Sequence, residues 1–323
     1  MLRTPATLRV VAVLGGSGFV GRALANRLQN ANLQIKILSR HRAHTRELWS
    51  LPNAHCVELD VYDPRALTAA FEGCQAIVNL VGILNERGDR GNGFHRAHVE
   101  LTECALAAAS AAGVPRYVQM SALNAAREAP SHYLKTKGEA EQLVNAIRDL
   151  RTAIVRPSVI FGAGDGLFNR FAPLVHYLPC LPLTGADARF QPVYVGDVVE
   201  AILRILTNER LNRGSCFELG GPRVWTLREI VDYTARIGGH HCPVIALPGW
   251  LGRVQAECCE HLPGKPFSRD NWRSLQLDSV VRGVDGLHAL GITPTPIETI
   301  MPQVLQPRRR PRDYAVLRRG AHR

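Results

Sequence analysis

The sequence predicts an α/β protein in which a doubly wound parallel sheet is followed by a smaller C-terminal α/β lobe. Three observations support this fold class. A glycine-rich turn directly follows the apolar run Val10–Leu14 near the N-terminus. The first half of the chain alternates short β-rich runs with helical stretches, which is typical of parallel sheets. After Arg156-Pro157 the pattern loosens, and proline and glycine become frequent.

Six short runs in the first half are expected to form strands. They are Val10–Leu14, Gln34–Ser39, Ala54–Leu59, Ala76–Val81, Arg116–Met120 and Thr152–Val155. Helices are expected between them at Phe19–Gln29, near Arg46–Trp49, from Asp63-Pro64 onward, at His95–Ala112 and at Ser131–Ile147. Six strands with helices in alternation predict the doubly wound Rossmann sheet.

The second half is expected to form a lobe that is interleaved with the edge of this sheet. Helical spacing recurs at Leu167–Tyr177, Val195–Thr207, Leu227–Ile237 and Leu251–His261. We therefore divide the chain into a dinucleotide-binding domain (1–157), a substrate or partner lobe (158–306) and a basic tail (307–323). Ligands of such folds bind at the carboxyl ends of the strands, where this lobe is expected.

Composition is that of a globular protein, with 46% hydrophobic and 21% charged residues. No apolar run approaches the roughly 18 residues of a membrane-spanning helix. The N-terminal segment is too short for a secretory leader, so the chain is expected to begin near its mature start. The eight cysteines form no Cys-x-x-Cys pair. Reduced thiols, a cytoplasmic location and no metal site are therefore expected.

The net charge of +11 is concentrated at the C-terminus. From Pro307 onward the chain has one acid, Asp313, and seven arginines, at positions 308, 309, 310, 312, 318, 319 and 323. Two interpretations stay open. The tail is a solvated end, or it is attracted to an anionic membrane surface or an acidic partner protein, which would place the protein peripherally on the inner face of a membrane. No nucleic acid is expected, because no nucleic-acid-binding module is recognisable.

The turn after the first strand has the spacing of a phosphate-binding loop. Gly15 permits the tight turn, Gly18 permits close approach of a pyrophosphate, and Gly21 permits close packing of the following helix. Unpaired N–H groups and the positive end of the helix dipole would then face the phosphates. The cofactor-binding residues expected in this segment also include Ser17, Phe19 and Val20.

The end of the second strand bears on the choice of cofactor. An acid about 20 residues after the glycines commonly holds the ribose 2′-hydroxyl of NAD. This sequence has Arg40 there, and a guanidinium suits a 2′-phosphate. The sequence therefore predicts NADP(H) in preference to NAD(H), unless Arg40 is a plain surface residue. Position in the fold adds residues after the third and fourth strands: Asp60, Val61, Leu80, Val81 and Gly82.

A Tyr-x-x-x-Lys spacing indicates a reactive centre. Tyr133 and Lys137 share one face of a predicted helix. An ammonium beside a phenol is expected to lower the pKa of the phenol and to hold the nicotinamide ribose. Ser121, at the end of the fifth strand, could polarise a carbonyl. The alternative is an ordinary exposed helix face.

Together these motifs resemble the extended or atypical short-chain dehydrogenase/reductases. More narrowly, the chain resembles the nucleotide-binding accessory subunit of respiratory complex I and its stand-alone bacterial relatives. The broader resemblance is carried by the glycine motif, the Tyr133/Lys137 pair, Arg156-Pro157 and Gln191–Val198. The narrower one is carried by Ser131–Lys137, Gln191–Asp197 and the late stretch from Arg269-Asp270 through Leu290–Pro296. The resemblance implies tightly bound NADPH, a contact of Pro157 with the cofactor, and a position near a membrane and a quinone site. Asp197 either closes over the cofactor or caps a helix beginning near Val198.

Three functions follow as hypotheses. The first is an NADP(H)-dependent oxidoreductase acting on a quinone or lipid-like substrate, with Ser121, Tyr133 and Lys137 as catalytic residues. The second is a non-catalytic NADPH-binding accessory or assembly factor of a membrane respiratory complex. The third is a nucleotide-sugar epimerase or dehydratase, which Arg40 and the apolar stretch Phe168–Leu183 disfavour.

Overall fold

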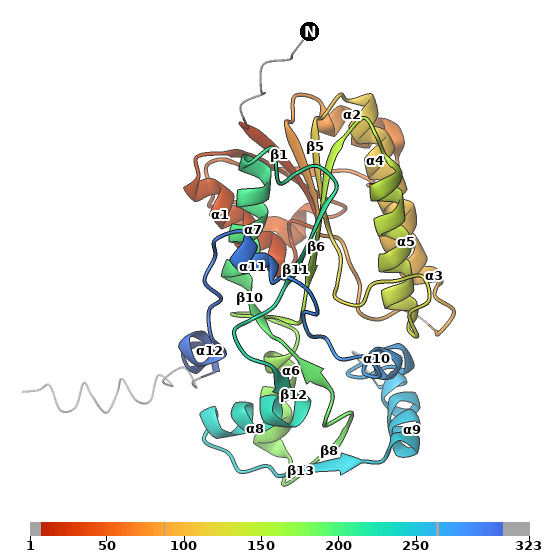
Figure 1. Ribbon diagram of the computed structural model, residues 1–323, viewed down its shortest axis with the longest axis vertical. Helices are drawn as coiled ribbons and strands as arrows, with labels where there is room; N and C mark the ends of the chain where they lie inside the picture. Colours follow the sequence, from red (N-terminus) through yellow and green to blue (C-terminus); the bar gives the residue numbers. More distant parts are fainter. Residues whose placement is uncertain (1–7, 87, 263–264, 306–323) are drawn as a thin grey trace, which may run out of the picture.

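The computed structural model describes residues 8–86, 88–262 and 265–305. A seven-stranded sheet forms its upper part in Figure 1, and a smaller lobe lies below the carboxyl ends of the strands. In spatial order the strands are β11 (Ser215–Leu219), β6 (Arg151–Pro157), β5 (Arg116–Met120), β4 (Ala76–Asn79), β1 (Val10–Leu14), β2 (Gln34–Ser39) and β3 (Ala54–Glu58).

All neighbouring strands of this sheet run parallel. The chain starts at β1, proceeds outward through β2 and β3, and then crosses to β4 on the other side of β1. Val11 consequently lies between Ile35 of β2 and Ala76 of β4. The change of direction between β1 and β4 is the switch point at which doubly wound sheets bind ligands. The predicted fold class is confirmed.

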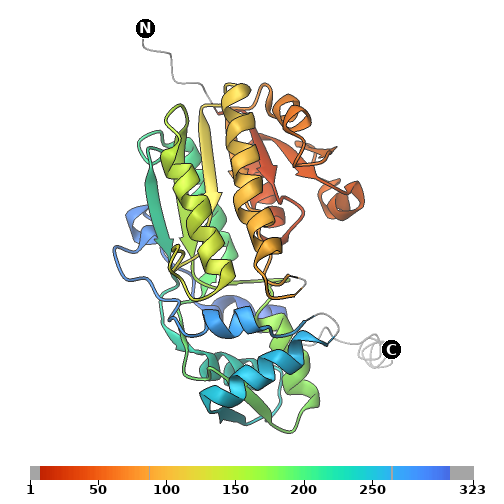
Figure 2. The ribbon, with the colours of Figure 1, turned by 90° about the vertical axis from the view of Figure 1, so that its right-hand side faces the viewer.

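Helices cover both faces of the sheet. On one face α1 (Phe19–Asn30) and α7 (Val195–Thr207) bury Leu24, Leu28 and Ile202 against the strands. The other face carries α2 (Pro64–Phe71), α4 (Leu101–Ala111) and α5 (His132–Ala146), and α4 and α5 lie side by side in front of the sheet in Figure 2. Each face therefore has its own apolar core.

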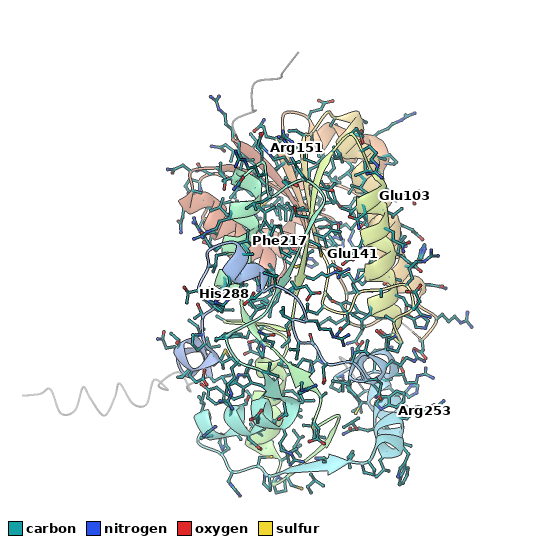
Figure 3. All side chains as sticks on the ribbon, in the orientation of Figure 1. Glu103, Glu141, Arg151, Phe217, Arg253 and His288 are labelled. Carbon is teal, nitrogen blue, oxygen red and sulfur yellow. The ribbon has the colours of Figure 1, made fainter. Side chains whose placement is uncertain are left out.

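A buried ion pair also fixes α5 to the sheet. Glu141, labelled between α5 and β6 in Figure 3, is 4% exposed and accepts two hydrogen bonds from Arg156 of β6. The bond from Arg156 Nε is 2.8 Å long. A buried carboxylate needs such a partner. The pair thus sets the height of α5 along the strands.

The structure corrects the predicted number of strands from six to seven. The seventh strand, β11, pairs in parallel with β6, with Ser215 opposite Ala153 and Leu219 opposite Pro157. The sequence Ser-Cys-Phe-Glu-Leu is short and its burial shows no strict alternation. Only the long-range pairing with β6 identifies it as a strand. Residues after 157 thus return to the sheet through α7, β11 and α11 (Gly286–Ala289).

The lobe is built from helices and two-stranded sheets. Its elements are β7 (Ile160–Phe161), α6 (Phe168–Tyr177), β8 (Leu181–Thr184), β9 (Arg189–Phe190), β10 (Val193–Tyr194), β12 (Trp225–Thr226), α8 (Leu227–Ile237), β13 (Val244–Leu247), α9 (Gly249–Glu260), α10 (Arg269–Ser274) and α12 (Ile297–Leu305). Phe161, Phe168, Trp225 and Met301 form one of its cores. The sequence predicted α6, α7, α8 and α9 but not the shorter α10, α11 and α12.

The predicted helix His95–Ala112 is divided into three parts. α3 (Asn92–His95) is followed by a π-helical turn, η2 (Arg96–Glu100), and only then by α4. The predicted helix near Arg46–Trp49 is a 3₁₀ helix, η1 (Arg42–Leu48), and not an α-helix. π-Helical turns re-aim side chains and are frequent at functional sites.

None of the helices in the described ranges combines the length and apolarity required to span a bilayer. The basic tail, for which both interpretations stay open, lies outside the described residues.

Candidate functional site

The glycine turn between β1 and α1 has the geometry that a phosphate cradle requires. Gly15 has φ = +75°, a value that favours glycine, and a Cβ there would lie 3.1 Å from the backbone of Leu80 and Val81. A Cβ at Gly21 would lie 2.4 Å from the carbonyl oxygen of Gly15. Gly21 therefore lets the helix approach the turn itself. Gly18 is the N-cap of α1 and provides no side-chain cap, so the first N–H groups of α1 remain for a ligand.

A cavity of about 310 Å³ opens beside this turn. It is lined by Gly15, Ser17, Leu38, Ser39, Arg40, His41, His44, Val61, Tyr62, Val81, Ile83, Gly93, Arg96, Ala97 and Leu101. Five residues selected from the sequence are thus brought together here: Gly15, Ser17, Arg40, Val61 and Val81. Asp60 does not line the cavity, and its carboxylate accepts the backbone N–H of Tyr62 at 3.0 Å.

One wall of the cavity is basic. Arg40, His41 and His44 follow β2, and the rings of the two histidines meet edge to face at 5.3 Å. Arg96, on the π-helical turn, lies with its guanidinium 4.7 Å from the ring centroid of Tyr62. The residues that line the cavity include no carboxylate. This wall can attract a phosphate by charge-assisted hydrogen bonding.

Lys137 lies where β4 and β5 end. Its Nζ donates to the carbonyl oxygens of Val81, at 3.2 Å, and Met120, at 3.0 Å. A Cβ at Gly82 would lie 3.3 Å from the same Nζ, which explains why glycine suits this position. Burial lowers the pKa of Lys137 to about 8, although Glu141 opposes this shift.

Tyr133 is one turn before Lys137 on α5, as the spacing predicts. Its ring packs edge to face on His98, at 5.5 Å between centroids, and on Phe94, at 6.2 Å. Burial raises the pKa of Tyr133 to about 12. The lowering of this pKa that the Tyr–Lys spacing predicts is not found, because burial of the phenol disfavours the phenolate and raises the pKa instead.

Ser121 immediately follows β5. Its N–H donates to the carbonyl oxygen of Val155 at 2.7 Å, which fixes the backbone. Ser121 is 3% exposed, and its Oγ has no hydrogen-bond partner within the described part of the chain. Because a buried hydroxyl without a partner costs free energy, this oxygen is available to bind a ligand.

His98 is a member of the site that the sequence analysis did not select. It lies on the π-helical turn, is 1% exposed, and its Nδ1 is 2.9 Å from Thr136 Oγ1. Its Nε2 accepts the N–H of Ile83 at 3.2 Å, so the imidazole is neutral with its proton on Nδ1. Burial, and to a smaller extent Lys137, lower its pKa to about 2. The sequence signal that could have identified His98 is the presence of a histidine within an apolar, alanine-rich predicted helix.

The remaining selected residues have structural positions. Phe19 and Val20 are the first two residues of α1. Pro157 ends β6, and its carbonyl accepts the N–H of Leu123 at 3.1 Å; it does not line the cavity. Asp197 is not the cap of α7, which is Tyr194; instead it lies in the first turn.

The carboxylate of Asp197 is used for a long-range contact. It accepts the backbone N–H of Thr295 at 2.7 Å and its hydroxyl at 2.9 Å. The helix-cap reading of Asp197 is therefore corrected, because Asp197 ties α7 to the segment that precedes α12.

The residues present fit a nicotinamide dinucleotide. The cradle of glycines, the uncapped start of α1 and the unpartnered Ser121 hydroxyl all provide donors for phosphates and hydroxyls. The glycine turn follows β1 and Ser121 follows β5, so these groups flank the switch point between β1 and β4.

A different group has the donor types of a metal site. Atoms of Asp89, His132 and Asp270 all lie within 4.8 Å of one another. Asp89 Oδ1, however, is paired with Arg273 at 2.6 Å, and Asp270 accepts two backbone N–H groups. These oxygens are thus engaged by the protein itself.

The comparisons with known proteins agree with this geometry. The model of the NAD dependent epimerase/dehydratase family matches residues 11–220. The protein named NADH dehydrogenase (ubiquinone) 1 alpha subcomplex subunit 9, mitochondrial, of Arabidopsis thaliana is 32% identical over 279 residues, which cover 84% of this chain and 68% of that protein. A ceramide reductase of Caulobacter vibrioides is 30% identical over 247 residues, which cover 74% of each.

A solved structure shows the same fold. The dTDP-glucose 4,6-dehydratase of Streptomyces venezuelae, with NAD bound, superposes with a TM-score of 0.73 over 92% of this chain and 96% of that chain, at 19% sequence identity. At this identity the likeness extends to the fold alone. The similarity to the complex I subunit agrees with the resemblance that the sequence motifs indicate.

Proposed function

The chain belongs to the NAD dependent epimerase/dehydratase family and binds a nicotinamide dinucleotide, and from this premise we propose that it is an NADP(H)-dependent reductase of a carbonyl on an apolar, quinone-like or lipid-like molecule. One observation carries the proposal. Ser121 follows β5, the Nζ of Lys137 binds carbonyl oxygens where β4 and β5 end, and Tyr133 lies one helical turn before Lys137 on α5. A hydride acceptor can be held there beside a proton donor.

Each side chain has a task that its surroundings support. Ser121 Oγ, which lacks a partner in the described chain, can donate to the substrate carbonyl oxygen. Two of the three N–H donors of Lys137 bind the Val81 and Met120 carbonyls, which leaves one for a ribose hydroxyl. When bound, the cofactor supplies a hydride from the nicotinamide.

Tyr133 is suited to act as the proton donor of a reduction. Since burial raises its pKa to about 12, the phenol carries its proton at neutral pH. A protonated phenol can give that proton to the oxygen of a carbonyl as it is reduced. Oxidation of an alcohol would need the phenolate instead. A protonated Tyr133 is therefore consistent with the proposed reduction.

The preference for NADP(H) rests on the basic wall of the cavity. Arg40 lies where an acid would hold the 2′-hydroxyl of NAD, and His41, His44 and Arg96 line the same cavity. A 2′-phosphate would therefore meet positive charge without a competing carboxylate.

The substrate class draws on the lobe and on the relatives. The ceramide reductase is named for reducing a lipid, and the complex I subunit is named for a complex that uses ubiquinone. Large apolar side chains are exposed on the lobe: Tyr177, Ile245, Trp250, Val254 and Leu262. An apolar substrate, delivered from a membrane surface, would suit both facts.

A single-turnover assay tests the proposal. Protein loaded with NADPH is mixed with quinones, prenylated phenols and long-chain ketones, and loss of NADPH absorbance is followed. We expect Tyr133→Phe to reduce the rate at least a hundredfold without changing NADPH binding. Tyr177→Phe, which alters an exposed tyrosine of α6, should react like wild type. Equal rates for wild type and Tyr133→Phe would overturn the proposal.

A second function is favoured by the complex I relative. The chain would then hold NADPH without turnover, as an accessory or assembly factor of a membrane respiratory complex, and the dinucleotide would stabilise the fold by mass action. NADPH should co-purify without exchange, and membranes should bind the protein in a salt-sensitive way. Rapid exchange of NADPH together with absence from membranes would exclude this function.

A further inference from the structure

The N-terminus of α5 is capped from two distant parts of the chain. Ser131, the residue that precedes the helix, accepts the N–H of Leu134 at 3.2 Å. Asp270 of α10 accepts the N–H of His132 at 2.7 Å through Oδ1 and the N–H of Tyr133 at 3.1 Å through Oδ2. The lobe therefore supplies a cap, and one of the two amides that it binds belongs to Tyr133 itself.

Placing the Asp270 carboxylate at this contact costs free energy, because the carboxylate is buried. The side chain of Asp270 is 5% exposed, and burial of a carboxylate is unfavourable unless hydrogen bonds and charge compensate. The two amides and the positive end of the α5 dipole provide that compensation. Arg273, 3.7 Å from Asp270 Oδ1, adds a second positive charge. Several groups thus hold this one carboxylate at the start of α5.

The same segment of the lobe also holds the loop that follows Gly82. Asn271 Nδ2 donates to the carbonyl oxygen of Leu84 at 3.2 Å, and Lys265 Nζ donates to that of Glu86 at 2.8 Å. Arg273 forms two bonds to Asp89, 2.6 and 2.7 Å long. In Figure 2, α10 passes directly beneath the lower end of α5. Residues 265–273 therefore form hydrogen bonds to both the loop and the helix that border the reactive centre.

We propose that Asp270 is a positioning residue for Tyr133. By binding the backbone of Tyr133, this residue of the lobe sets the position of the phenol. This inference rests on the proposed reductase function. The backbone of Tyr133 is held by Asp270, while its ring is held by His98 and Phe94. Asp270 does not line the dinucleotide cavity, so a change there should act on proton transfer and not on cofactor binding.

The first test is the split between kcat and KM in Asp270→Asn. An amide has one acceptor oxygen, and its NH₂ would face the second backbone N–H. We expect kcat for carbonyl reduction to fall at least tenfold, with KM and the NADPH dissociation constant within twofold of wild type. Asp285→Asn is the matched control, because Asp285 Oδ1 caps α11 by accepting the N–H of Leu287 at 2.9 Å. This control should retain wild-type kcat.

Asp270→Glu separates positioning from folding. It retains a carboxylate with two acceptor oxygens on a side chain that is longer by one methylene, so kcat should recover to a value between those of Asn and wild type. Should Asp270→Asn fail to fold, Asp270→Glu alone is compared with wild type, and the same split with at least a threefold loss of kcat is expected. A wild-type kcat in Asp270→Asn, or in Asp270→Glu where Asp270→Asn does not fold, overturns the proposal.

A spectroscopic measurement distinguishes this inference from the proposed function. The protein is labelled with fluorotyrosine, and the ¹⁹F resonance of Tyr133 is assigned by its loss in Tyr133→Phe. The resonance should shift in Asp270→Asn and remain in place in Asp285→Asn. If wild type has no turnover but the resonance shifts, the reductase function fails and the positioning holds. If the resonance does not move in Asp270→Asn, the positioning proposal is refuted whatever the activity.

Discussion

The Nδ1 atom of His98 lies 2.9 Å from the hydroxyl oxygen of Thr136, one residue before Lys137. This bond joins the π-helical turn to α5, and the N–H of Ile83 reaches the other ring nitrogen at 3.2 Å. Three segments around the reactive centre are thereby linked through one neutral imidazole.

The neutral state of His98 predicts a pH dependence of stability. Its pKa is lowered in the folded protein from 6.5 to about 2, so below pH 6.5 the unfolded chain takes up a proton that the folded chain does not. Stability therefore falls with acidification, by about 1.4 kcal/mol per pH unit from this residue. Urea unfolding should show His98→Gln less stable than wild type at pH 7.5, with the difference shrinking by about 2 kcal/mol at pH 5.

His95→Gln is the control for this measurement, because His95 is 51% exposed by its side chain. Its unfolding free energy should run parallel to that of wild type over the same pH range. A difference between wild type and His98→Gln that stays constant from pH 7.5 to pH 5 would contradict the neutral assignment.

The glycine turn predicts a sharp difference between two alanine substitutions. In Gly21→Ala the new Cβ would lie 2.4 Å from the Gly15 carbonyl oxygen, so the turn must move. We expect a loss of about 2 kcal/mol in stability, as for overpacked sites, and loss of the thermal shift that NADPH produces. Gly166→Ala should change stability by no more than about 0.5 kcal/mol, since a Cβ there meets nothing within 4 Å. Retention of the NADPH shift in Gly21→Ala would count against the cradle.

Arg40 should control the choice between the two dinucleotides. Hydrogen bonds to a charged group contribute about 1.5–3 kcal/mol, so Arg40→Ala should bind NADPH roughly ten- to a hundredfold more weakly while NADH affinity stays within about twofold. Calorimetry measures both. Arg42→Ala is the matched control, because Arg42 does not line the cavity and instead lies 5.5 Å from the ring of Trp49. Equal losses for NADPH and NADH in Arg40→Ala would show that Arg40 does not read the 2′-phosphate.

Local signals in the sequence predicted the central part of the fold. The apolar run Val10–Leu14 forms β1 with the same bounds, and the glycines that follow adopt the turn that their spacing indicates. Ser131 caps the helix whose start it predicts, and Tyr133 and Lys137 share that helix. These features depend on neighbours within a few residues, which a sequence pattern records.

Other features of the site depend on distant residues. β11 is a strand because it pairs with β6, and Asp270 caps α5 from 138 residues away. His98 reaches the site because a π-helical turn interrupts a helix that periodicity predicts as regular. The direction of the Tyr133 pKa shift was also missed, since desolvation depends on the packed environment and not on the Tyr–Lys spacing.

The Lys137 ammonium is expected to lower the stability of the fold while it contributes to cofactor binding. Burial lowers its pKa from 10.5 to about 8, which corresponds to a cost of about 3 kcal/mol for keeping the ammonium charged below pH 8. Lys137→Met removes this cost together with two hydrogen bonds, so without cofactor it should be about as stable as wild type at pH 7.5. NADPH binding should weaken at least tenfold, because the donor to the ribose is lost.

The pH dependence of the free energy of unfolding tests whether the Lys137 ammonium is buried at a cost. Between pH 8 and 10.5 the folded protein has released the Lys137 proton while the unfolded chain still holds it, so stability rises with pH in this window. Wild type should therefore gain about 1–2 kcal/mol over Lys137→Met when the pH is raised from 7.5 to 9.5 in urea unfolding. Lys135→Met, at a neighbouring position on α5, should follow the wild-type curve. A constant offset between wild type and Lys137→Met would mean that the ammonium is not buried at a cost, and its role at the ends of β4 and β5 would need another explanation.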